Sequence, residues 1–143
     1  MERRRPRTPA ARPLVLIVDG HDETLALYAI ALSAMGFDVI PAKDAAEGFH
    51  RAWGLHPDII VTELVLRHPS GWELLERLKD EPRTREIPVV VLTEHAQSAV
   101  HDRARRCGCA ALFVKPCLPG QLGRELRKLL VPPVSHAHAS ASH

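Results

Sequence analysis

Residues 14–19 read LVLIVD, an unbroken run of mostly branched apolar side chains that ends on a carboxylate. A run of this kind, without alternation between apolar and polar residues, is typical of a strand that is buried on both faces. Similar apolar runs follow along the chain at spacings of about 20–30 residues. This is the length of one strand plus a crossover helix. The four later runs are FDVI at 37–40, IIV at 59–61, VVVL at 89–92 and ALFV at 111–114.

The segments between these runs carry helix signals. Asp44 with Glu47, and Ser70 with Glu73, have the spacing of a capping box at a helix start, and Pro82 ends the second of these helices. The sequence therefore predicts helices at about 24–35, 45–54, 71–81, 96–107 and 119–130.

Strands and helices alternate along the whole middle of the chain, which predicts an α/β fold. Because the strands are continuous apolar runs, we expect a doubly wound, five-stranded parallel sheet with helices on both faces. Right-handed crossovers then favour the strand order 2-1-3-4-5. In such a sheet, ligands bind outside the carboxyl ends of the strands.

The 143 residues suit one domain, which we place at 13–131. Residues 1–12 form an arginine- and proline-rich basic leader, and residues 132–143 form a His-containing tail; both are expected to be disordered.

Three cysteines, an odd number, do not make a disulfide framework. No membrane span and no secretory h-region are visible, so the expected location is cytoplasmic.

Polar side chains follow four of the five predicted strands. Asp19 follows the first, Glu63 comes two residues after the third, Thr93 follows the fourth and Lys115 follows the fifth. Asp19 and Glu63 offer the oxygen ligands that Mg²⁺ prefers, while Thr93 and Lys115 suit a tetrahedral oxyanion such as a phosphoryl group. Taken singly, each residue fits a simpler role, as a member of an ordinary ion pair or as a helix cap. Taken together, they predict a site.

The chain resembles the receiver domain of two-component response regulators, the CheY-like family, over about residues 13–131. The matching segments are VLIVD at 15–19, PDIIVTEL at 57–64, Gly71, IPVVVLT at 87–93, Gly108 and VKP at 114–116. The resemblance implies a flavodoxin-like fold in which an aspartate after the third strand accepts a phosphoryl group from a histidine kinase. It further implies that Thr93 and Lys115 contact the phosphoryl group and that Asp19 helps to hold Mg²⁺.

The chain departs from the family pattern at three informative positions. Glu63 replaces the phosphoacceptor aspartate, and its extra methylene moves the carboxylate outward by about 1.5 Å, a displacement that in-line chemistry tolerates poorly. Gly20 replaces a second metal-binding acid, so Asp19 and Glu63 make at most a weakened Mg²⁺ site unless Asp22 folds back. Leu112 occupies the switch position, where the family usually has an aromatic residue.

We therefore expect a stand-alone, receiver-like signalling protein, a pseudo-receiver that is not an enzyme and does not depend on phosphorylation. Its expected partners are signalling proteins, a histidine kinase or a downstream effector, bound through the face of the last two strands and helices (residues 89–130). Glu63 either mimics the phosphoryl charge or forms a plain stabilising pair with Lys115. The second hypothesis is slightly favoured because Leu112 is not aromatic.

Three alternatives stay open. The protein could be an active response regulator that is phosphorylated on Glu63. It could instead be a flavodoxin-like nucleotide or FMN-binding protein, although Gly20-His21-Asp22 is too acidic to cradle a phosphate. Nucleic-acid binding through the arginine leader is disfavoured because the run is short and lacks interleaved aromatic residues.

Overall fold

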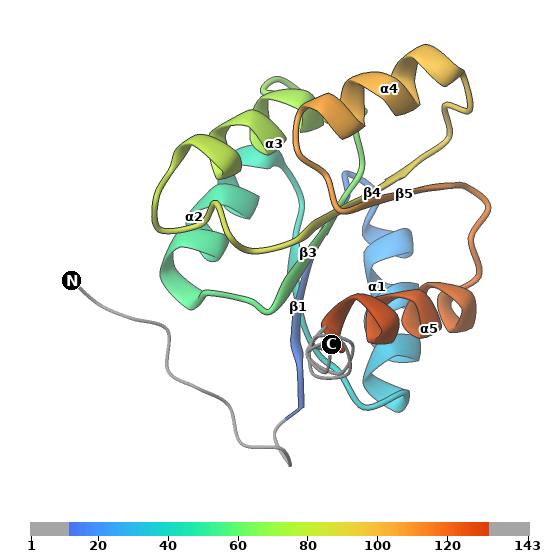
Figure 1. Cartoon of the computed structure of the whole chain (residues 1–143). Coiled ribbons are helices and arrows are strands. Elements are labelled where there is room, and N and C mark those ends of the chain that lie inside the picture. Colours follow the sequence, from blue (N-terminus) through green and yellow to red (C-terminus); the bar gives the residue numbers. More distant parts are fainter. Residues whose placement is uncertain (1–11, 132–143) are drawn as a thin grey trace, which may run out of the picture.

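The computed structural model describes residues 12–131, which form one parallel sheet covered by helices on both faces (Figure 1). The elements in chain order are β1 (Leu14–Val18), α1 (Asp22–Ala34), β2 (Asp38–Ala42), α2 (Ala45–Leu55), β3 (Ile59–Thr62), α3 (Gly71–Asp80), β4 (Val89–Thr93), α4 (Ser98–Arg106), β5 (Ala111–Val114) and α5 (Pro119–Leu130). The sheet has five strands in the order β2-β1-β3-β4-β5. The predicted fold class and strand order are confirmed.

Several element boundaries differ from the prediction by one or two residues, and two of these differences have clear local reasons. Phe37 does not begin the second strand, because its backbone N–H closes the end of α1 by donating to the carbonyl of Leu32. Helix α1 begins two residues earlier than predicted, and its first turn carries Asp22 and Glu23. Acidic side chains are favourable there because they lie at the positive end of the helix dipole.

The strands read as continuous apolar runs because alternate residues enter two separate cores. Val15 and Ile17 of β1 pack in the core covered by α1 and α5, whereas Leu16 and Val18 pack in the core covered by α2 and α3. All four side chains are almost fully buried. Figure 1 shows α1 and α5 on one side of the sheet and α2 and α3 on the other. A sheet buried on both faces thus explains the absence of alternation.

The start of the described chain is held against the domain. The Arg12 guanidinium donates to Asp38 Oδ1 at 2.9 Å and to the carbonyls of Ser33 and Phe37 at 2.8 Å each. Arg12, which the predicted boundary assigned to the leader, therefore belongs to the folded unit. The rest of the predicted leader, residues 1–11, and the predicted tail, residues 132–143, lie outside the described residues.

The starts of α2 and α3 follow the capping patterns in the sequence. Asp44 accepts a hydrogen bond from the backbone N–H of Glu47, and Ser70 with Glu73 forms a complete capping box.

None of the helices in residues 12–131 has both the length and the apolar character that crossing a membrane requires.

Gly71 starts α3 directly beneath the backbone that carries Glu63. A Cβ atom at this position would lie 2.1 Å from the Glu63 carbonyl oxygen and 2.6 Å from the Leu64 Cα. Both are backbone atoms, which cannot rotate away as the end of a side chain can. The loop after β3 would therefore have to move. Only glycine allows α3 to approach the site this closely.

We predict that Gly71→Ala lowers the free energy of unfolding by about 2–4 kcal/mol, because it forces a clash with backbone atoms. Gly54→Ala is the matched control: it is also helical, but its Cβ atom meets nothing within 4 Å. The control should stabilise the protein by up to about 1 kcal/mol. Urea unfolding of both variants checks this, and equal effects would refute the proposed close approach.

Candidate functional site

The ammonium group of Lys115 lies between two buried carboxylates. Its Nζ is 3.0 Å from Glu63 Oε1 and 3.1 Å from Asp19 Oδ2. Asp19 follows β1 and Glu63 follows β3, and these strands are neighbours in the sheet, so parallel pairing places both acids at the same edge. Lys115 follows β5, two strands away from β3, and its length lets it cross the intervening end of β4.

The remaining carboxylate oxygens face backbone donors. Glu63 Oε2 accepts hydrogen bonds from the N–H groups of Leu64 at 2.7 Å and Val65 at 3.2 Å. Asp19 Oδ1 accepts one from the N–H of His21 at 2.9 Å. Asp19 and Glu63 are only 3% and 6% exposed, so these bonds replace the water that both charges lose on folding.

The positive charge on Lys115 is stabilised by this arrangement. Burial alone would lower the pKa of Lys115, but its hydrogen bonds and attraction to Glu63 and Asp19 outweigh burial and raise that pKa above the ordinary lysine value. The charged form of Lys115 is therefore favoured at neutral pH. The three groups together act as one buried ion cluster with a cation at its centre.

Thr93 lies next to Lys115, and its side chain bonds to the loop after β4. Its side chain is fully buried, and its Oγ1 accepts a hydrogen bond from the N–H of His95 at 3.2 Å. The Thr93 carbonyl accepts one from the Lys115 backbone N–H at 2.7 Å. Thr93 thus shares the edge of the sheet with the ion cluster while its hydroxyl orders the loop after β4.

The other two predicted site residues lie away from the ion cluster. Leu112, in β5, packs partly buried on the α2–α3–α4 side of the sheet. Asp22, the conditional third metal ligand, lines a different pocket, together with Pro41, Lys43 and Arg51. The structure therefore brings Asp19, Glu63 and Lys115 into direct contact, with Thr93 beside them, and places Leu112 and Asp22 elsewhere.

The two carboxylates that would hold a Mg²⁺ ion are both paired with Lys115. Within residues 12–131, no group of three or more His, Cys, Asp or Glu side chains is placed to share a metal. The two carboxylates that do converge, Asp19 and Glu63, both bind the Lys115 ammonium, which supplies the positive charge that a metal would bring. Position 20, where a further acid would help, is glycine.

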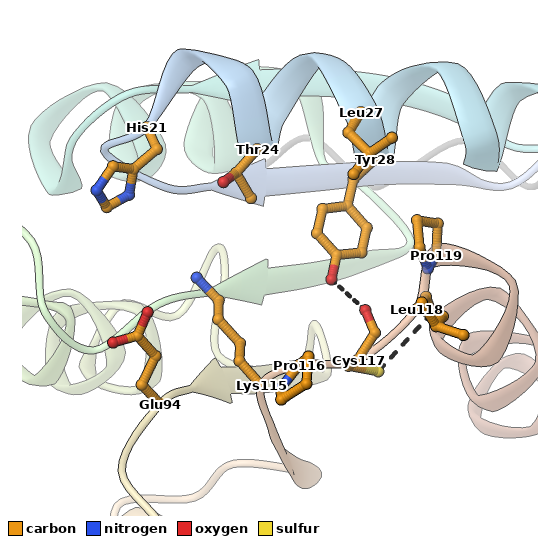
Figure 2. A pocket seen from close by; sticks show the side chains of 10 residues that line it. All are labelled: His21, Thr24, Leu27, Tyr28, Glu94, Lys115, Pro116, Cys117, Leu118 and Pro119. Carbon is orange, nitrogen blue, oxygen red and sulfur yellow. Dashed lines mark hydrogen bonds between the residues drawn. The ribbon is translucent and has the colours of Figure 1, made fainter.

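A pocket of about 610 Å³ opens beside the ion cluster, between α1 and the loop that joins β5 to α5. Figure 2 shows Lys115 reaching from the β5 side of this pocket toward the loop that carries His21. Deeper along the same wall, the Tyr28 hydroxyl donates a hydrogen bond to the Cys117 carbonyl, which ties the β5–α5 loop to α1. Burial raises the pKa of Tyr28, so the hydroxyl stays a donor at neutral pH.

His21, which the predicted site did not include, contacts Asp19. His21 Nδ1 lies 3.1 Å from Asp19 Oδ1, although the imidazole is 76% exposed. A signal was present, because aspartate side chains often accept a hydrogen bond from the backbone two residues ahead. That turn places His21 at the mouth of the site.

We predict that Lys115→Met lowers the free energy of unfolding by about 3 kcal/mol or more, because it leaves two buried carboxylates without a cation. Arg51→Met is the control, since it removes an i,i+4 pair with Glu47 of similar length, 3.0 Å, on a partly exposed helix. Its cost should be about 0.5 kcal/mol or less. Thermal and urea unfolding at pH 7 measure both variants, and a Lys115→Met effect no larger than the control would contradict the ion cluster.

Comparison with known proteins places the chain in one family. Residues 15–127 match the family model of the response regulator receiver domain. The polar-differentiation response regulator DivK of Brucella ovis is 32% identical over 102 residues, covering 71% of this chain and 83% of that protein. DivK of Brucella anthropi is 31% identical over the same shares of both chains.

Solved structures agree with the fold. The chemotaxis response regulator CheY4 of Vibrio cholerae superposes with a TM-score of 0.79 at 22% identity, covering 84% of this chain and all of that one. A response regulator from Desulfuromonas acetoxidans gives a TM-score of 0.75 at 30% identity, with 82% and 96% of the two chains covered. The family match spans most of the chain, and the strand order and helix placement are those of a CheY-like fold. The chain therefore belongs to the response regulator receiver family of two-component signalling.

Proposed function

We propose that this receiver domain is a pseudo-receiver, held in one state by its own Glu63–Lys115 pair and acting by protein–protein contact without phosphorylation. The observation that carries the proposal is the 3.0 Å contact between Lys115 Nζ and Glu63 Oε1 in a buried site. The face that we assign to partner binding is formed by β4, α4, β5 and α5.

The orientation of Glu63 supports a site that is already satisfied. One carboxylate oxygen binds Lys115, and the other is turned back onto the backbone N–H groups of Leu64 and Val65. A carboxylate that attacks a phosphoryl donor must present an oxygen in line with the leaving group. Attack by Glu63 would first break hydrogen bonds to a charged group, each worth about 1.5–3 kcal/mol.

The poor metal site supports the same conclusion. Phosphoryl transfer generates negative charge that cations must neutralise. In this chain Lys115 is already committed to Asp19 and Glu63, and Gly20 adds no further carboxylate. The cation that the site contains is thus used to hold the resting arrangement.

The surroundings of α4 favour a fixed domain over a switching one. The Arg103 guanidinium stacks over the Trp72 ring, 4.0 Å from its centroid, and this contact ties α4 to α3. Leu112, on the neighbouring strand, has no hydroxyl or ring that could swing between a buried and an exposed position. We therefore interpret Glu63–Lys115 as a lock more than as a mimic of the phosphorylated state.

The proposal predicts that the wild-type protein stays unlabelled when it is incubated with acetyl phosphate and Mg²⁺. The double variant Gly20→Asp/Glu63→Asp should gain one phosphoryl group, because it shortens the acceptor and adds a metal-binding acid. Position 20 has room for the change, since a Cβ atom there meets only the Lys43 carbonyl oxygen, at 4.0 Å. Intact-protein mass spectrometry reads the result.

Gly20→Asn/Glu63→Asp is the matched control, equal in shape but without the added charge, and it should label more weakly than the double aspartate variant. Acid-labile phosphate on Glu63 of the wild-type protein would overturn the proposal and favour an active response regulator that uses glutamate.

A further inference from the structure

Helix α1 has two apolar faces, and only one of them is buried. The core face is formed by its buried residues, Leu25, Tyr28 and Leu32. On the outer face, Leu27 and Ile30 are 56% and 72% exposed, and Ala34 is also exposed. A surface helix ordinarily turns polar residues outward, so an apolar outer face indicates contact with another protein surface.

The outer residues of α1 have the spacing of a seam between two helices. They are separated by four, three and four residues and are all exposed: Glu23, Leu27, Ile30 and Ala34. We call these four residues the α1 seam. Apolar residues at such spacing lie on one side of a helix and pack against a second helix. Because four-three-four reads the same in both directions, the seam matches a second copy of itself that runs antiparallel.

Helix α5 does not cover the α1 seam. It lies beside α1 on the same side of the sheet (Figure 1) and approaches α1 through Gly123. A Cβ atom at Gly123 would lie 3.2 Å from Leu32 Cδ2 and would also clash with the Met35 side chain. With 3.6 residues per turn, positions 32 and 35 lie on the side of the helix opposite the α1 seam. The seam therefore has space for another helix.

The charges at the two ends of α1 favour the antiparallel orientation. Its first turn carries Asp22 and Glu23. At its other end, the exposed guanidinium groups of Arg12 and Arg127 donate to backbone carbonyl oxygens that close the helix. Asp38 pairs with Arg12, so these three side chains together carry one net positive charge. An antiparallel copy brings each acidic end beside a basic end and opposes the two helix dipoles favourably, whereas a parallel copy places like charges together.

We infer that two copies of this chain form a dimer through the α1 seam, with the two helices antiparallel about a two-fold axis. Leu27 then packs against Ile30 of the partner subunit, and the axis repeats this contact. Glu23 lies near the basic end of the partner's helix. One helix pair buries less than the roughly 1,200 Å² of a standard stable interface, so the dimer should dissociate on dilution. The inference goes beyond the proposed function and uses no residue of the ion cluster.

Sedimentation velocity of the full chain at about 5, 50 and 500 µM tests the association. We expect the average mass to rise with concentration from that of one chain toward that of two. Ile30→Glu should weaken the dimer at least about tenfold, because it buries an unpaired charge beside Leu27. Leu55→Glu is the matched control, since it adds the same charge at a half-exposed apolar position of α2, on the other side of the sheet. The control should dimerise as the wild-type protein does.

A third variant tests the orientation of the two helices. Glu23→Gln removes an attraction to the basic end of an antiparallel partner and should weaken the dimer by about threefold, as expected for exposed ion pairs. In a parallel dimer the same change would relieve repulsion between two Glu23 carboxylates and strengthen association. NMR of the ¹⁵N-labelled wild-type chain locates the interface without any substitution, and concentration-dependent shifts should centre on Leu27 and Ile30.

A constant monomer mass up to the highest concentration would overturn the inference and leave the α1 seam to a different protein. Shifts centred on another surface, an equal loss in Leu55→Glu, or a stronger dimer in Glu23→Gln would also overturn it. Far-UV circular dichroism checks that each variant is folded. These outcomes do not depend on Glu63, whereas the phosphorylation assay does, so the two proposals can fail separately.

Discussion

The position of one ammonium group determines how this receiver domain can work. Lys115 lies between Asp19 and Glu63, at 3.1 and 3.0 Å, and forms an ion pair with both carboxylates. Within residues 12–131, the one other ion-pair partner of these two acids is the exposed His21, which contacts Asp19. Two carboxylates this close would repel each other in a site with little water. The cation stabilises the arrangement. Both oxygens of the Glu63 carboxylate, at the acceptor position, then have partners.

The architecture that brings these groups together can be predicted from the sequence. Strands buried on both faces must read as continuous apolar runs, and such runs at 14–18, 59–61 and 89–92 fixed the type and order of the main strands. Parallel strands end at one edge, so residues 19, 63, 93 and 115 had to meet there. The replacement of aspartate by glutamate at position 63 was equally visible, because it is a change of residue type.

Other features depend on side-chain geometry across elements, which periodicity does not encode. Arg12 binds Asp38, and Arg103 stacks over Trp72. Both contacts join segments whose relative rotation is set only by the packed structure. The same packing leaves the Nε2 atom of His101 buried without a hydrogen-bond partner among the described residues. Nothing in the residue pattern indicates that Arg103 stacks on Trp72.

The most direct test of the ion cluster is an NMR titration of the Lys115 side chain, followed through its ¹³Cε signal and assigned with Lys115→Met. We predict that Lys115 stays charged above the ordinary lysine pKa of about 10.4, because its two carboxylate partners outweigh its burial. Glu63→Gln should lower that pKa by removing one partner. Titration of Lys115 at or below the ordinary value in the wild-type protein would mean that no stable pair holds Glu63, and the account of a locked receiver would be wrong.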